Sequence, residues 1–149
     1  MDTKGYIYKR KANYYETDCM GIIHHSNYIR YFEEARIEYM YSIGCDIREM
    51  EKLGIIIPNV DAYARYYKTI KFFDDVEIEV RLTEFTGARM KLEYTIRFAE
   101  TGELASAGFT THCFVNEKFK PMSLRRAYPE LFNKLKEHIV SSDSLGKAE

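Results

Sequence analysis

The hydrophobic pattern of this chain changes period once, and that change limits the folds that the chain can adopt. From Ser26 to Ile43, apolar residues recur every three or four positions, which predicts an amphipathic helix of about four to five turns. After Gly54, apolar and polar residues alternate, which predicts long strands with one apolar face. Because the long helix is the only large element that could cover this face, we expect an α+β fold in which a curved antiparallel sheet wraps around the helix.

The strands are delimited by turns that contain Asp, Gly and Thr. Alternation predicts strands over about residues 60–66, 76–83, 90–98 and 104–115. The aromatic-rich segment 6–15 predicts one more strand, which brings the sheet to about five. In the last strand His112 is expected on the polar face, without a functional role. The apolar face of that strand is expected to carry Ala105, Ala107, Phe109, Cys113 and Val115.

Signals for helix ends agree with the helical pattern. Ser26 is expected as the N-cap of the long helix, and Gly44 stands where a left-handed residue would end it. Residues 46–53 predict a short second helix. Pro129 is expected to begin a C-terminal helix.

Length and composition favour one soluble domain. A chain of 149 residues can bury roughly 70% of the surface that it exposes when unfolded. The 22 Lys and Arg residues nearly balance 23 Asp and Glu residues, so nucleic acid and anionic membranes are not expected partners. No apolar run approaches the roughly 20 residues of a membrane span, and the N-terminus lacks a signal-peptide core, so a cytoplasmic location is expected. We expect residues 1–140 to form a single domain and residues 141–149 to form a polar tail.

The cysteines and histidines do not form a recognisable metal site. The three cysteines are far apart and include no CxxC pair, so neither a disulfide framework nor a structural zinc is expected. Asp18, Cys19, His24 and His25 could be considered as ligands, but their spacing matches no familiar site. No metal and no organic cofactor are therefore expected.

The segment just before the long helix carries most of the functional information. It reads Thr17-Asp18-Cys19-Met20-Gly21-Ile22-Ile23-His24-His25-Ser26-Asn27-Tyr28. The first residues of a helix have unpaired backbone N–H groups and a partial positive charge. Asp18 lies seven residues before His25, so its carboxylate and these donors could act on one substrate carbonyl. Such an arrangement is typical of acyl transfer.

Each residue of this segment also has a structural interpretation. Asp18 could form an Asx-turn that shapes the loop, and Gly21 could be an ordinary loop glycine or one that passes close to a ligand. The ring of His25 could orient Asp18 or contact the substrate, whereas His24 is expected to pack or to face solvent. Tyr28 could line a pocket or belong to the core.

A longer stretch around this segment matches a family pattern. It runs on through Tyr31-Phe32-Glu33-Glu34-Ala35-Arg36 and begins at Tyr15-Glu16. With it the chain resembles the hotdog-fold thioesterases, and most closely the 4-hydroxybenzoyl-CoA thioesterase-like family, which includes the Tol-Pal-associated acyl-CoA thioesterases. The resemblance covers most of the chain. It implies a hotdog fold, dimers whose two sheets join side by side, sites at the subunit interface, and pairing of dimers into tetramers.

The same resemblance implies hydrolysis of an acyl-CoA thioester to free CoA and a carboxylic acid. Asp18 would act as nucleophile or as general base, and the sequence leaves both routes open. The backbone N–H of His25 would bind the oxyanion, a contact that is typically worth about 3–4 kcal/mol of barrier. Gly21 and Tyr28 are expected to contact the substrate. Because CoA carries phosphates, basic residues are expected near the pocket mouth; the candidates are Arg89 and Lys91, and Lys118 and Lys120 are alternatives.

Other functions fit parts of this pattern. An acyl-carrier-protein thioesterase would share the chemistry but should present a docking patch for an acidic partner. A non-enzymatic acyl-CoA binding module would bind CoA esters without turnover, and the presence of Asp18 and Gly21 argues against it. A hotdog dehydratase is disfavoured because its usual pairing of Asp and His, in a different motif, is not visible.

Overall fold

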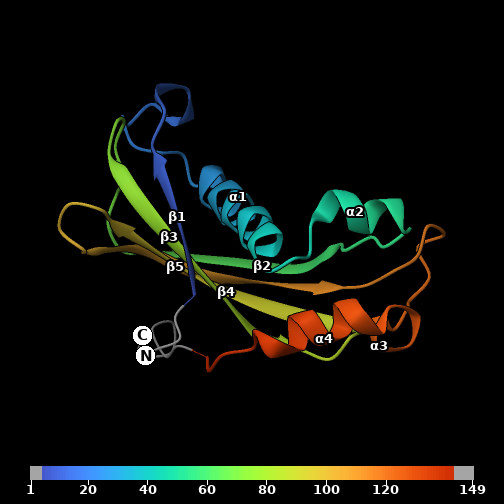
Figure 1. Cartoon of the computed structure of the whole chain (residues 1–149). Helices are drawn as coiled ribbons and strands as arrows, with labels where there is room; N and C mark the ends of the chain where they lie inside the picture. Colours follow the sequence, from blue (N-terminus) through green and yellow to red (C-terminus); the bar gives the residue numbers. More distant parts are fainter. Residues whose placement is uncertain (1–4, 143–149) are drawn as a thin grey trace.

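The computed structural model describes residues 5–142 and shows one curved antiparallel sheet with a long helix in its concave face (Figure 1). The strand order in the sheet is β1-β3-β4-β5-β2. The strands are β1 (Tyr6–Lys11), β2 (Asn59–Tyr66), β3 (Asp75–Phe85), β4 (Arg89–Phe98) and β5 (Leu104–Cys113). The helices are η1 (Tyr14–Glu16, a 3-10 helix), α1 (Ser26–Ser42), α2 (Ile47–Lys52), α3 (Leu124–Ala127) and α4 (Pro129–Glu137). The predicted α+β architecture is confirmed.

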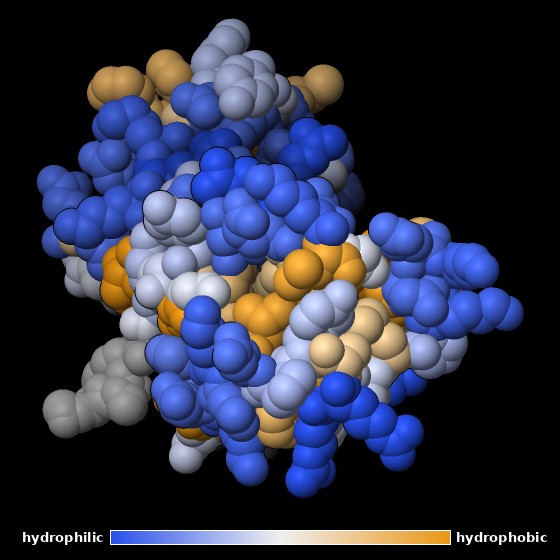
Figure 2. Space-filling view, turned by 45° about the vertical axis from the view of Figure 1, so that its right-hand side comes forward, coloured by the Kyte–Doolittle hydropathy of each residue, from blue (hydrophilic) through white to orange (hydrophobic). Residues whose placement is uncertain are grey.

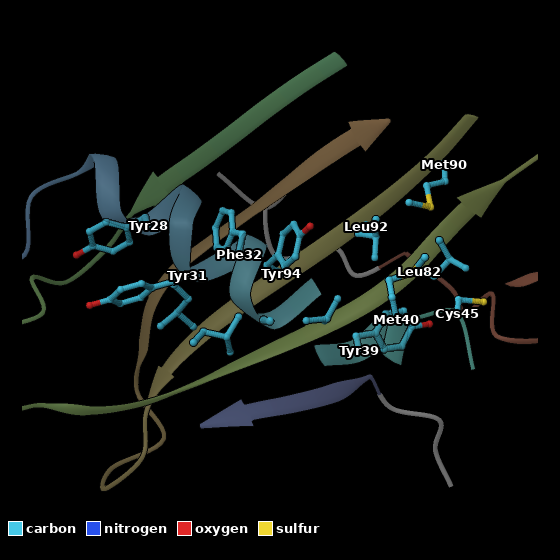
Figure 3. Packing of buried hydrophobic residues seen from close by; sticks show 14 of the residues in the cluster. Tyr28, Tyr31, Phe32, Tyr39, Met40, Cys45, Leu82, Met90, Leu92 and Tyr94 are labelled. Carbon is cyan, nitrogen blue, oxygen red and sulfur yellow. The ribbon is translucent and has the colours of Figure 1, made fainter. Parts of the chain in front are cut away.

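The long helix α1 forms the centre of the core. Its apolar stripe is buried against the sheet, and the ring of Phe32 lies flat on the ring of Tyr94 of β4, with centroids 4.4 Å apart and planes 5° apart (Figure 3). The stripe consists of Tyr28, Tyr31, Phe32, Ala35, Tyr39 and Met40. The helical period therefore identified the buried face correctly.

The alternation predicted for the two central strands is also confirmed. Val76, Ile78, Val80 and Leu82 of β3 are buried, and they pair in register with Phe98, Ile96, Tyr94 and Leu92 of β4. Directly paired residues of antiparallel strands point to the same face of a sheet, so both sets face α1.

The predicted orientation of β5 is wrong. Gly108 pairs with Tyr94, and Thr110 pairs with Leu92, so the face toward α1 carries Ser106, Gly108, Thr110 and His112. Ala107, Phe109 and Cys113 pair with Thr95, Glu93 and Arg89 and point to the opposite face. Ala105 lies at a register irregularity and is buried in the core, as predicted. Thr110 links the inner polar groups, because its Oγ1 lies 2.6 Å from Tyr94 Oη and 2.8 Å from His112 Nε2. His112, expected on the polar face, is 1% exposed.

The first strand is shorter than predicted. It ends at Lys11, and the chain then turns into η1 instead of continuing to Tyr15. The carboxylate of Glu16 causes this turn, since it accepts a hydrogen bond from the N–H of Asn13 at 2.9 Å and is itself buried.

The N-cap of α1 also differs from the prediction. Ser26 is the first helical residue, and His25 is the N-cap, with helical φ and ψ of −56° and −28°. The Ser26 N–H donates to Nδ1 of His24 at 3.1 Å, so a histidine takes the place of the expected hydroxyl cap. At the other end, Gly44 has the predicted left-handed conformation, with φ of +86°.

Two further observations concern the described residues as a whole. No helix among them has the length and apolar content needed to span a bilayer. No group of three or more potential His, Cys, Asp or Glu ligands gathers within residues 5–142.

The buried His112 predicts a decrease in stability toward acid. Burial, together with the positive charge of Arg36, lowers the pKa of His112 to about 4 from 6.5. In the unfolded chain His112 therefore binds a proton at a higher pH than in the folded chain. The folded state keeps its full stability above pH 6.5 and loses stability as the pH falls toward 4. We expect the free energy of unfolding to drop by on the order of 3 kcal/mol over this range. Urea denaturation of wild type and His112→Gln at several pH values in this range measures this effect. The free energy of unfolding should depend less on pH in the variant than in wild type.

Candidate functional site

A small β-hairpin just before α1 presents the functional segment. The His24 N–H donates to the Glu16 carbonyl at 2.8 Å, Thr17 and Ile23 form a β-bridge, and the Asp18 N–H donates to the Ile22 carbonyl at 2.9 Å. Its second arm also joins the chain after β2, because the Ile23 N–H donates to the Ile70 carbonyl at 2.8 Å. The hairpin is thus anchored on both sides, and its turn contains Asp18 and Gly21.

The turn positions the carboxylate of Asp18. The Gly21 N–H donates to the Asp18 carbonyl at 3.0 Å, and Gly21 has a φ of +78°. A Cβ at Gly21 would meet nothing within 4 Å, so glycine is needed here for its conformation and not for a close approach. The Met20 N–H donates to Oδ1 of Asp18 at 2.8 Å, which is the Asx-turn considered above. Among residues 5–142, no group donates a hydrogen bond to the other carboxylate oxygen, Oδ2.

A pocket of about 220 Å³ brings the candidate residues together. It lies between the hairpin, the start of α1 and the end of β2. Its lining includes Asp18, Ile22, His25, Tyr28, Tyr66 and Lys68. Three of the predicted site residues therefore share one cavity, and Gly21 shapes the turn beside it.

The start of α1 offers a backbone donor at this pocket. Within the described part of the chain, no acceptor is hydrogen-bonded to the N–H of His25. The His25 side chain is exposed, and its ring stacks on the ring of His24 at 4.1 Å. His24 is engaged in the helix start through Ser26, so the structure assigns it a local structural role.

Two tyrosines form an aromatic wall of the pocket. Tyr28 is 3% exposed, and its ring meets that of Tyr66 edge to face at 4.7 Å. Burial raises the pKa of the Tyr28 hydroxyl above its ordinary value, so the ring stays neutral. The Tyr66 hydroxyl donates to the His25 carbonyl at 3.4 Å and links the wall to the helix start.

Arg89 and Lys91 do not line this pocket. Arg89 pairs with Cys113 and Tyr66 pairs with Ser106, and these two positions of β5 are roughly 23 Å apart along an extended strand. Lys91 projects from the outer face of the sheet, with Nζ 4.6 Å from the ring centroid of Phe109. Among residues 5–142, the cation that lines the pocket within one chain is Lys68, and no pattern in the sequence pointed to it.

Comparison with known proteins decides the family. The family model of the thioesterase-like superfamily matches residues 13–134. The chain belongs to this superfamily. The match includes the hairpin, α1, the four strands β2 to β5 and most of α4, so the predicted membership is confirmed.

Individual relatives agree with this assignment. A candidate esterase of Aquifex aeolicus is 41% identical over 74% of this chain and 84% of its own length. A candidate acyl-CoA thioesterase of Bacillus subtilis, YneP, is 31% identical over 80% of this chain and 87% of its own. The solved structure of DHNA-CoA thioesterase from Staphylococcus aureus superimposes with a TM-score of 0.84 at 36% identity, covering 88% of each chain. The hotdog fold and the thioesterase class are thereby confirmed.

Gly21 and Gly102 provide a matched test of the hairpin turn. Both have φ near +78°, and a Cβ at either would meet nothing within 4 Å. Alanine at either position should cost about 1–2 kcal/mol, because it adopts the left-handed conformation poorly. We expect only Gly21→Ala to reduce thioester hydrolysis, since Gly102 lies in the β4–β5 turn and does not line the pocket. Thermal melting and a hydrolysis assay of both variants check this, and equal losses of activity would contradict a specific role for the Gly21 turn.

Proposed function

We propose that the protein hydrolyses acyl-CoA thioesters to free CoA and carboxylic acids, with Asp18 and the His25 N–H acting on the thioester carbonyl. The observation that supports this most strongly is the pocket that contains both groups, each with hydrogen-bonding capacity not used within residues 5–142. The relatives named as thioesterases of acyl-CoA and DHNA-CoA support a CoA ester as substrate.

The proposed reaction needs little beyond these two groups. In one route an oxygen of Asp18 attacks the thioester carbon, and the thiolate of CoA leaves to give a mixed anhydride that water then hydrolyses. In the other route Asp18 takes a proton from water, the resulting hydroxide attacks the same carbon, and the tetrahedral intermediate expels the CoA thiolate to leave the carboxylic acid. In both routes the acyl oxygen becomes negative, and the His25 N–H and the positive end of α1 stabilise it. No metal or organic cofactor takes part.

The edge strand β2 supports a homodimer. Val60, Tyr63 and Tyr66 are all more than 40% exposed, and an unpaired edge with large apolar residues is prone to pair with another strand. Figure 2 shows hydrophobic residues exposed in the middle of one face of the chain. Antiparallel pairing of two β2 strands would bring the partner's Asn59 end beside the Tyr66 end of the first chain. Arg89 and Lys91 of the partner subunit would then lie on the side of this pocket, where they could bind CoA phosphates.

Several expectations complete this proposal. We propose a homodimer or homotetramer in the cytoplasm, with residues 1–140 as a single domain. The tail over residues 141–149 falls almost wholly outside the described residues. A binding module is the alternative outcome of the first assay below, and a preference for carrier-bound over CoA-bound acyl groups would indicate a carrier-protein thioesterase.

The first test replaces the proposed catalytic carboxylate. Asp18→Asn keeps an acceptor oxygen for the Met20 N–H, so the turn should persist while the negative charge is lost. We expect release of free CoA to fall by about 10²–10⁴-fold across short, long and aromatic acyl-CoAs. Asp46→Asn is the matched control, because Asp46 also accepts from a backbone N–H two residues on, that of Arg48, but lies at the start of α2. Tight binding of CoA esters without turnover by wild type would favour the binding module.

The second test separates the His25 backbone from its ring. The φ of His25, −56°, is compatible with proline, and its N–H is not hydrogen-bonded within the described residues. His25→Pro should therefore fold but lose the oxyanion donor, and we expect kcat to fall by about 10²–10³-fold. His25→Ala removes the ring and keeps the N–H, so it serves as the control. If the alanine variant loses as much kcat as the proline variant, the ring and not the backbone is responsible.

A further inference from the structure

Glu16 is the least exposed acidic residue among residues 5–142, and it lies two positions before Asp18. Its side chain is 5% exposed. The hydroxyl of Tyr31 donates to Oε1 at 2.6 Å, and the Arg10 guanidinium donates to both oxygens, at 3.0 Å and 2.6 Å. Burial alone would raise the pKa of Glu16, but these hydrogen bonds and that from the Asn13 N–H hold it below its usual range. The group is therefore a fixed anion.

The carbonyl of the same residue is held from the other side. It accepts from the His24 N–H at 2.8 Å and from Nδ2 of Asn27 at 3.0 Å. These donors flank His25, and Asn27 is itself buried in the first turn of α1. Glu16 thus connects the arm of the hairpin that carries Asp18 to the helix start that carries the His25 N–H.

A second carboxylate shares the same cation. Arg10 also donates to Glu34 of α1, through Nε at 2.6 Å and Nη2 at 3.1 Å, and the Tyr8 hydroxyl donates to the same Glu34 at 3.1 Å. Arg10 lies over the ring of Tyr31, 4.2 Å from its centroid. One cation from β1 therefore ties η1 to the middle of α1.

We propose that Glu16 is a positioning residue for thioester hydrolysis, because its side chain, fixed by Tyr31 and Arg10, sets where the hairpin joins the start of α1. This rests on the proposed function. The geometry defines what the residue controls. Its carbonyl accepts the hairpin hydrogen bond nearest to α1, and Asp18 follows it by two residues. Small displacements of a catalytic group are sufficient to lower a rate considerably while substrate binding is retained. A residue that only stabilises the fold would not separate these two effects.

The experiment compares two tyrosines that donate to different carboxylates of this network. Tyr31→Phe removes a hydrogen bond to Glu16, and Tyr8→Phe removes one to Glu34. Both substitutions delete one oxygen and keep the ring, and neither residue lines the pocket. We expect Tyr31→Phe to lower kcat at least tenfold with KM within twofold of wild type. Tyr8→Phe should keep kcat within twofold.

A second readout covers the case in which Tyr31→Phe loses stability. The amide resonances of Asp18 and His25 are recorded by NMR in folded samples of both variants. We expect both resonances to shift in Tyr31→Phe and to stay in place in Tyr8→Phe. Equal kcat values for the two variants, or unmoved resonances in Tyr31→Phe, would overturn the positioning role. If wild type is active and Asp18→Asn is inactive, such a result leaves the proposed function intact; if wild type releases no CoA from any thioester, the function fails and the positioning role with it.

Discussion

The flat contact between Phe32 and Tyr94 sets how deeply α1 lies in the sheet, and the rest of the structure depends on it. Gly108, opposite Tyr94 on β5, makes room for this contact. A Cβ at Gly108 would lie 2.8 Å from the Phe32 ring and 2.1 Å from the Tyr63 carbonyl oxygen. Any other residue there would force the helix and the β2 edge apart. Because α1 is a rigid rod, its depth also decides where its first turn, with the His25 N–H, meets the hairpin.

The elements that could be predicted from the sequence are those in which periodicity reports burial directly. The stripe of α1 and the alternation of β3 and β4 contain large apolar residues on one face only, so their orientation follows from the pattern. In β5 neither face has this contrast. Small and polar residues face α1 because Phe32 and Tyr94 already fill the space, and Thr110 Oγ1 is hydrogen-bonded both to Tyr94 Oη and to Nε2 of His112. Orientation there depends on register with β4, which no local pattern shows.

The residues of the candidate site also fall into those that the sequence predicts and those that only the tertiary structure brings together. Asp18, Gly21 and His25 are close in sequence, so one motif could place them together before any fold was known. Lys68 and Tyr66 reach the pocket only because the end of β2 packs beside the hairpin. The link from Arg10 through Glu16 to Tyr31 joins β1, η1 and α1. The charges of Arg10, within the aromatic-rich segment 6–15, and of Glu16, just after it, do not by themselves predict these partners. Contacts of this kind follow from the tertiary structure.

The surroundings of Glu16 and Asp18 explain why two carboxylates so close in the chain can have different roles. Both oxygens of Glu16 are occupied by Tyr31, Arg10 and a backbone N–H, so its lone pairs are committed and water is excluded. A carboxylate in that state is a poor nucleophile and a poor base, because reaction would break several charge-assisted hydrogen bonds. Asp18 uses one oxygen in its turn and presents the other without a donor from residues 5–142, at a pocket that also contains the His25 N–H. In the proposed reaction, the carboxylate that acts on the thioester is the one whose second oxygen accepts no hydrogen bond from residues 5–142, and the proposed role of the buried carboxylate is to hold it in place.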